Sequence, residues 1–181
     1  VTVSLDTNYR SKLWSIGKAS RVIGELMRYT DICITNPGDI KDLFGIVSDK
    51  ADFDLKKPDN EGAASVAEKL MKRYPLKGAA LTLRTNLSAS DNDFGAMLCD
   101  GEATVFSRKY RMHIADRVGG GDAFAAGLIY SLLKQKASQE AVEFAAAAAV
   151  LKHSVEGDFN RVAAAEVENL AGGDGSGRVQ R

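Results

Sequence analysis

Three consecutive glycines, Gly119, Gly120 and Gly121, stand directly before Asp122 and a run of residues with helical spacing. Glycines at the start of a helix let the backbone approach a ligand closely, and their N–H groups and the helix dipole bind anions. The amides could hold charge on a transferring phosphoryl group while the Asp122 carboxylate accepts a hydroxyl proton. Local composition leaves one alternative open, in which Asp122 caps the helix after a flexible hinge.

Two common glycine motifs are excluded. A Gly-x-Gly-x-x-Gly dinucleotide fingerprint that starts at Gly119 needs glycine at position 124, where this chain has Phe124. A nucleotide-binding Gly-Lys-Ser/Thr loop is absent from the sequence. The residues therefore predict an anion cradle with a carboxylate beside it, which suits phosphoryl transfer to a hydroxyl group.

The run from Asp116 to Asp122 resembles the Asp-Thr-x-Gly-Ala-Gly-Asp signature of the PfkB/ribokinase family of sugar kinases. It departs from that signature at Arg117, which replaces threonine, and at Gly120, which replaces alanine. The resemblance implies that Asp122 is the catalytic base and that Gly119, Gly120 and Gly121 form the anion hole.

The segment from Ser4 to Trp14 is similar to the Asp-x-Asn-x-Arg-x-x-Leu-Trp segment of 2-keto-3-deoxygluconate kinases within that family. This likeness implies that Arg10 binds the carboxylate of a sugar acid, near Asp122. A guanidinium group suits the task, because it binds a carboxylate through two parallel hydrogen bonds. The alternative is that Arg10 forms a structural ion pair with Asp6.

Asn36 and Asp39 stand where the family has an Asn-x-x-Glu motif, which organises Mg²⁺ and phosphate through water. The resemblance implies that Asn36, Asp39 and Asp116 lie near the phosphates and cations, as indirect Mg²⁺ ligands or near a monovalent cation. A helix cap with a first-turn acid is the alternative for Asn36 and Asp39.

The resemblance also implies an ATP site formed by Arg84, Gly119, Gly121 and His153. Arg84 lies in the segment that lines the nucleotide in such kinases, and His153 in the segment that flanks adenine. Two alternatives remain open: Arg84 as a solvated loop residue, and His153 as a helix C-terminal residue favoured by the dipole.

The elements that must position these residues alternate along the chain. Apolar periodicity predicts strands at 1–5, 31–35, 78–83, 94–99, 103–106 and 110–114, and helices at 18–30, 37–44, 61–74, 119–134, 139–152 and 161–170. This order is typical of an α/β fold with helices on both faces of a mostly parallel sheet. The resemblance implies a ribokinase-like fold without its N-terminal lid region.

Polar segments follow the predicted strands. Those that begin at Asp6, Asn36, Arg84 and Asp116 should meet at one edge of the sheet, where ligands bind in such folds. Residues 48–60 are predicted to form an exposed loop, and residues 84–93 a mobile one.

Composition excludes several classes of partner. The 181 residues carry 24 Lys and Arg against 24 Asp and Glu, so the chain lacks the basic surplus of nucleic-acid and membrane-surface binders. No apolar stretch is long enough for a transmembrane helix. Cys33 and Cys99 lie in apolar runs, which favours reduced core residues in a cytoplasmic protein.

The chain opens on a strand pattern without Met, and it matches only the C-terminal part of such kinases. We therefore expect one domain over residues 1–181, with a flexible tail at 172–181, to be part of a longer, homo-oligomeric kinase.

The implied reaction phosphorylates a sugar acid, 2-keto-3-deoxygluconate, to its 6-phosphate with ATP and Mg²⁺, with a monovalent cation as a further candidate cofactor. Three alternatives stay open: a fructokinase or ribokinase type of sugar kinase, a nucleotide-binding fragment without catalysis, and a purely structural domain.

Overall fold

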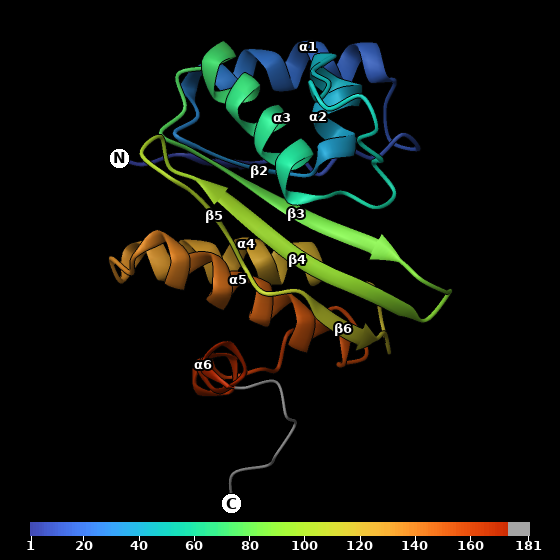
Figure 1. Cartoon of the computed structure of the whole chain (residues 1–181), viewed down its shortest axis with the longest axis vertical. Coiled ribbons are helices and arrows are strands. Elements are labelled where there is room, and N and C mark those ends of the chain that lie inside the picture. Colours follow the sequence, from blue (N-terminus) through green and yellow to red (C-terminus); the bar gives the residue numbers. More distant parts are fainter. Residues whose placement is uncertain (174–181) are drawn as a thin grey trace, which may run out of the picture.

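A computed structural model describes residues 1–173, and in it a central sheet lies between two layers of helices (Figure 1). The strands are β1 (Ser4–Asp6), β2 (Ile32–Thr35), β3 (Gly78–Asn86), β4 (Asp91–Cys99), β5 (Thr104–Phe106) and β6 (Tyr110–His113). The helices are α1 (Ile16–Leu26), α2 (Pro37–Phe44), α3 (Asn60–Arg73), α4 (Gly120–Leu133), α5 (Ser138–His153) and α6 (Ala164–Gly172), with a short 3₁₀ helix, η1 (Met27–Tyr29), after α1.

The sheet has a parallel half and an antiparallel half. Its strand order is β1-β2-β3-β4-β5, and β6 pairs with β4 beyond the end of β5. β1, β2 and β3 run parallel, whereas β4 is antiparallel to β3 and to both later strands. The carboxyl ends of the three parallel strands therefore lie along one edge, as predicted.

Each face of the sheet carries its own hydrophobic core. Along β3, Ala79 and Leu81 pack toward α1, α2 and α3, while Ala80 between them packs toward α4 and α5. This alternation follows from the two-residue period of a strand. Figure 1 shows the two helical layers on opposite sides of the sheet, with α6 beyond α5. The predicted α/β class with helices on both faces is confirmed.

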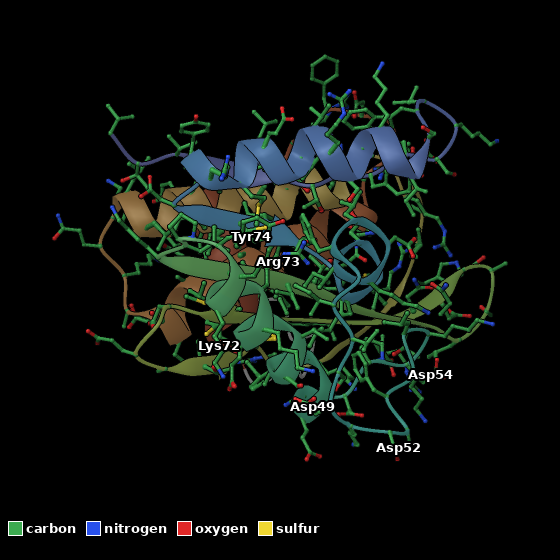
Figure 2. The ribbon with its side chains drawn as sticks, turned by 90° about the horizontal axis from the view of Figure 1, so that it is seen from above. Asp49, Asp52, Asp54, Lys72, Arg73 and Tyr74 are labelled. Carbon is green, nitrogen blue, oxygen red and sulfur yellow. The ribbon has the colours of Figure 1, made fainter. Side chains whose placement is uncertain are left out.

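The end of α3 is bound to the end of α2 by a hydrogen bond and an aromatic contact. Arg73 donates a hydrogen bond to the carbonyl oxygen of Phe44, and the Tyr74 ring packs edge-on against the Phe44 ring. Figure 2 labels both residues at the end of α3, and shows Asp52 and Asp54 on the loop that leads from α2 to α3. Both acids are exposed, as the sequence predicted for this loop.

The prediction of a mobile loop over residues 84–93 is wrong for most of its length. β3 continues to Asn86 and β4 begins at Asp91, which leaves a turn of four residues. The polar side chains pair across the turn, because the Ser88 hydroxyl donates to Asp91 at 2.8 Å and the Asn92 amide donates to Asn86 at 2.9 Å.

The other predicted elements are present with shifted ends. The Ala-rich α5 is buried along most of its length, as predicted for a helix that is apolar on nearly every side. No helix within residues 1–173 has the length and apolarity needed to cross a bilayer. Of the predicted tail, Gly172 still belongs to α6, and residues 174–181 lie outside the described part of the chain.

Candidate active site

A cavity of about 410 Å³ opens at the carboxyl ends of the parallel strands. Six of the residues that the sequence singled out line it: Arg10, Asn36, Asp39, Arg84, Gly121 and His153. The others, Asp116, Gly119, Gly120 and Asp122, belong to the loop and first turn of α4 beside it. Five segments that are distant in sequence thus meet at one edge of the sheet.

Asp6 and Asp39 form an acidic wall of this cavity. Burial raises the pKa of the Asp6 carboxyl, and the negative charges of Asp122 and Asp39 raise it further. Asp122 is therefore close enough to Asp6 for their charges to repel. A cation or a hydroxyl group that enters between these carboxylates would relieve the repulsion.

Asn36 and Asp39 also have structural partners. Asn36 caps α2 by accepting a hydrogen bond from the Asp39 N–H at 2.9 Å. One oxygen of Asp39 accepts from the Thr7 hydroxyl at 2.8 Å and from the Tyr9 N–H at 3.2 Å. This oxygen ties the end of β1 to α2, and the second oxygen has no hydrogen bond within the described residues.

The acidic wall fits Mg²⁺ held mainly through water. Carboxylate oxygens are the ligands that Mg²⁺ prefers, and the ion commonly keeps several of its waters. Within residues 1–173 no three His, Cys, Asp or Glu side chains converge closely enough to hold a metal ion by themselves. Coordination of Mg²⁺ through water near Asn36 and Asp39 stays a prediction.

Arg10 contributes an exposed guanidinium group to the same cavity. Its Nη1 atom donates to the carbonyl oxygen of the neighbouring Tyr9 at 3.0 Å. Among the ion pairs of the described residues none joins Arg10 to Asp6, so the alternative of a structural pair is not realised. The remaining N–H groups of Arg10 are available to an anion.

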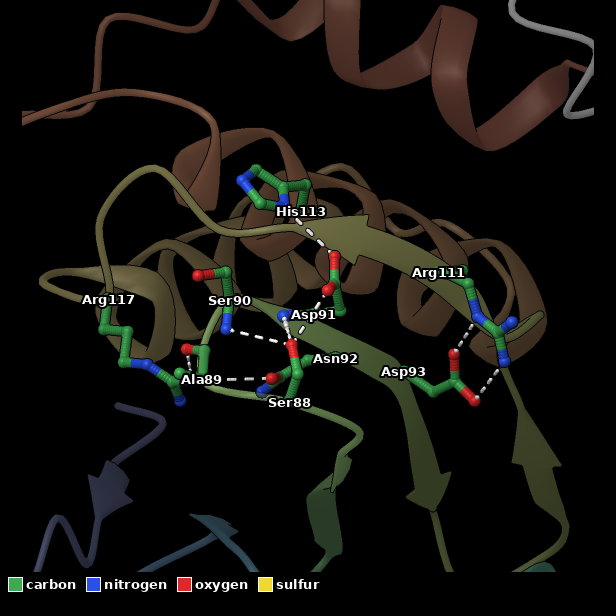
Figure 3. Close-up of polar contacts among 9 residues, drawn as sticks. All are labelled: Ser88, Ala89, Ser90, Asp91, Asn92, Asp93, Arg111, His113 and Arg117. Atoms are coloured by element: carbon green, nitrogen blue, oxygen red, sulfur yellow. Dashed lines mark hydrogen bonds and ion pairs between the residues drawn. The ribbon is translucent and has the colours of Figure 1, made fainter.

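Arg84 and Arg117 form the basic side of the cavity. The protein around Arg84 desolvates its guanidinium group, and this effect and the nearby charge of Arg117 lower the Arg84 pKa. Arg117 reaches from the loop before α4 to the β3–β4 turn, where it donates to the carbonyl oxygen of Ala89 at 2.7 Å (Figure 3). Two neighbouring guanidinium groups of this kind would be stabilised by an anion between them.

The glycine loop begins α4 with a residue in the left-handed conformation. Gly119 is the N-cap, with a φ of 76° that favours glycine. Asp122 lies in the first turn of the helix and is not its cap, so that alternative is wrong. A side chain at Gly121 would meet no atom within 4 Å, which leaves its backbone open toward the cavity.

Gly120 has a different reason to be glycine. A methyl group at this position would overlap the imidazole ring of His153, 2.7 Å from its Nε2 atom. The departure from the family's alanine at Gly120 is thus explained by the buried histidine behind it. His153 lines the cavity at the end of α5, but its ring also sets how closely α4 approaches α5.

The tautomer of His153 follows from its hydrogen bond. Nδ1 lies 2.6 Å from the carbonyl oxygen of Ala149, which can only accept, so Nδ1 carries the proton. Burial lowers the pKa of the ring, and the charges of Arg84, Lys152 and Arg117 add to this effect. The histidine is therefore neutral near pH 7, with Nε2 free to accept a hydrogen bond.

Asp116 fastens the glycine loop to the segment after α5. Its two oxygens accept hydrogen bonds from Val118 N–H at 3.0 Å and from Gly157 N–H at 2.9 Å. These bonds hold the pKa of Asp116 below its usual value. Both oxygens thus have backbone partners, and a role near a cation stays a prediction.

Sequence reasoning missed three cationic residues of this region. Arg117 and Lys56 line the cavity, and Lys152 is buried beside Gly119. The replacement of the family's threonine by Arg117 was the available signal, because a new charge next to an anion cradle suggests an anion ligand. Lys56 lies in a loop whose path the sequence does not determine.

Comparisons with known proteins identify the family. The model of the pfkB family carbohydrate kinases matches residues 2–163. A curated relative, 2-dehydro-3-deoxygalactonokinase from Haloferax volcanii, is 27% identical over 174 residues, which are 96% of this chain and 48% of the relative.

Two solved structures are also similar. The 2-dehydro-3-deoxygluconokinase of Thermotoga maritima is 41% identical with a TM-score of 0.88, and the alignment covers 96% of this chain and 51% of that protein. A PfkB family carbohydrate kinase from Listeria grayi is 31% identical with a TM-score of 0.83, over the same shares of the two chains. The chain spans about half the length of these relatives, and it belongs to the PfkB family of carbohydrate kinases.

Proposed function

We propose that this chain is the ATP-binding and catalytic part of a sugar-acid kinase, which converts 2-keto-3-deoxygluconate to its 6-phosphate. The observation that carries the proposal is the shared cavity, because the free guanidinium group of Arg10 and the open helix start at Gly121 line the same space. The names of the relatives from Haloferax and Thermotoga, both kinases of 2-dehydro-3-deoxy sugar acids, support the substrate class.

In the proposed reaction each group has one task. Arg10 binds the carboxylate of the substrate and orients its far hydroxyl group toward Asp122, which accepts the hydroxyl proton. The N–H groups of Gly119, Gly120 and Gly121 hold the negative charge that spreads over the transferring phosphoryl group. ATP supplies that group when bound, and Mg²⁺ supplies charge neutralisation.

Arg84 and Arg117 complete the proposed nucleotide site, since both line the same cavity. Their charges, unpaired with any carboxylate in the described residues, suit a polyphosphate. His153 offers a neutral imidazole next to the glycine loop, which suits contact with an uncharged part of the nucleotide. The proposal also includes a cytoplasmic location and a homo-oligomeric complete protein.

The base is tested by Asp122→Asn in the complete protein. We expect kcat to fall by about a thousandfold, a usual contribution of a general base, while ATP still binds with its normal Kd. Steady-state kinetics and calorimetry measure the two effects separately. A variant with near-normal kcat would show that Asp122 is not the base.

The substrate class is tested by Arg10→Ala. Loss of a charge-assisted bond to a carboxylate should lower kcat/KM for 2-keto-3-deoxygluconate by about a hundredfold, and leave turnover of a neutral sugar nearly unchanged. Lys12→Ala, which removes an exposed charge two residues away, serves as the control. Equal activity of wild type and Arg10→Ala would favour a fructokinase or ribokinase type of kinase.

A further inference from the structure

Lys152 is the most deeply enclosed charged side chain of residues 1–173. It has 0% exposure, whereas each of the other Lys, Arg, Asp and Glu residues described retains contact with solvent. Its Nζ atom donates to the carbonyl oxygens of Gly157 at 2.7 Å and Val155 at 3.1 Å. No carboxylate forms an ion pair with it among the described residues.

This arrangement needs a physical reason, because an ammonium group taken out of water loses several kcal/mol of hydration. Backbone carbonyl oxygens alone are an unusual set of partners for a buried lysine, but they are the ligands that bind monovalent cations such as K⁺. The Lys152 ammonium group thus has the kind of partners that a bound monovalent cation has.

The position of Lys152 connects it to the anion cradle. Its Cε atom lies 3.1 Å from the place where a side chain of Gly119 would begin, so the lysine packs directly behind the N-cap of α4. The same loop that accepts its hydrogen bonds is held by Asp116, through the Gly157 N–H. Lys152 and Asp116 therefore fix the 154–158 loop and the glycine loop against each other.

We propose that Lys152 is a tethered cation that replaces a free monovalent cation beside the glycine loop, and that it positions Gly119 to Gly121 for binding phosphate. The proposal rests on the function proposed above and removes the need for a monovalent cofactor. Lys152 acts through the 154–158 loop and the glycine loop, so it is a positioning residue and does not touch the substrate.

The test compares wild type, Lys152→Met and Lys152→Ala in potassium, ammonium and tetramethylammonium chloride at equal ionic strength. Calorimetry with Mg-ATP gives Kd, and thermal unfolding without nucleotide gives Tm. Wild type should show the same Kd and Tm in all three salts. Lys152→Met keeps the volume without the charge, and its Kd should be at least about tenfold weaker.

Lys152→Ala opens space for a free cation. We expect ammonium or potassium ions, but not tetramethylammonium, to restore part of its Tm and its ATP affinity. Lys109→Ala, which removes an exposed lysine, should show no salt specificity. A wild type that needs potassium, a folded Lys152→Met with normal Kd, or a Lys152→Ala that responds to no cation would each overturn the proposal.

The two proposals fail in different ways. A wild-type chain that binds no ATP would contradict the proposed function, but the salt dependence of Tm in Lys152→Ala would still decide whether the lysine replaces a cation. Normal ATP binding together with a potassium-dependent wild type would leave the kinase assignment intact and contradict the role of Lys152.

Discussion

His153 shows how one side chain serves both the stability and the site of this protein. Its ring is buried, hydrogen-bonded through Nδ1 to Ala149 and packed against Gly120. A buried imidazole near three cationic groups resists protonation, so its pKa is below the ordinary value of 6.5. We therefore expect the folding stability of the protein to depend on pH through this ring behind Gly120.

The sign of this dependence follows from proton binding. Between the lowered pKa of folded His153 and 6.5, the unfolded chain binds more protons than the folded one, so the free energy of unfolding decreases as pH falls. We expect urea unfolding of wild type to show this loss as the pH falls below about 7.5, at up to about 1.4 kcal/mol per pH unit, until the ring is protonated in the folded protein as well.

The variant His153→Gln should flatten this slope, because it has no group to protonate. His113→Gln is the matched control. His113 is the other of the two histidines of the sequence, and it is exposed on β6, where it pairs with Asp91. A wild-type slope that His153→Gln leaves unchanged would mean that other groups cause the acid sensitivity.

Individual site residues were predictable where their type and neighbours carried the signal. The glycines, Asp122 and Arg10 were singled out in this way, and the structure places them in or beside one cavity. Lys152 was not, because a lysine in the last turn of a helix normally interacts with the dipole and remains in water. Its burial depends on the path of the loop at 154–158, which no local pattern in the sequence specifies.

At the scale of elements, the contact between α4 and α5 explains why position 120 is glycine. Gly120 must lack a side chain because His153 stands behind it, whereas Gly121 faces open space. Gly120→Ala should therefore lower the free energy of unfolding by about 2 kcal/mol, as overpacking does elsewhere. Gly121→Ala should change it little, and denaturant unfolding measures both.

A double variant identifies the cause of this difference. In a His153→Ala background the ring is gone, so Gly120→Ala should cost much less than it does in wild type. The interaction energy in this cycle should be at least about 1 kcal/mol. Additive effects of the two substitutions would show that Gly120 is needed for its backbone and not for space.

Apolar periodicity predicted the helices and most strands, because each buries one face or both against the sheet. It failed at residues 84–93, where Ser, Asn and Asp indicate a loop. Those side chains pair with each other across the β3–β4 turn, and Arg117 adds a bond to that turn from the loop before α4 (Figure 3). Cross-strand pairing of polar residues depends on register, which composition does not reveal.

At the scale of the whole molecule, the net charge is zero, but acidic and basic side chains are grouped separately within the cavity. Asp6 and Asp39 lie on one wall, and Arg84 and Arg117 on another. Such a division suits two ligands that differ in charge: the carboxylates suit a hydroxyl acceptor with its cation, and the arginines suit a polyphosphate. The chain also spans about half the length of its relatives, so ligand binding and turnover need not reside in the same segment.

Calorimetry of the chain with Mg-ATP, beside a turnover assay with 2-keto-3-deoxygluconate, separates these two properties. We expect saturable ATP binding, because the glycine loop and both arginines are in place, together with a rise in Tm from ligand linkage. Gly121→Val, whose side chain would project into the open side of the cradle, should abolish binding and remain folded.

We expect little turnover, since parts of the relatives outside the aligned half would be needed to enclose the sugar and exclude water. Efficient turnover by the chain alone would contradict that expectation, and absence of ATP binding in a folded wild type would favour a purely structural domain.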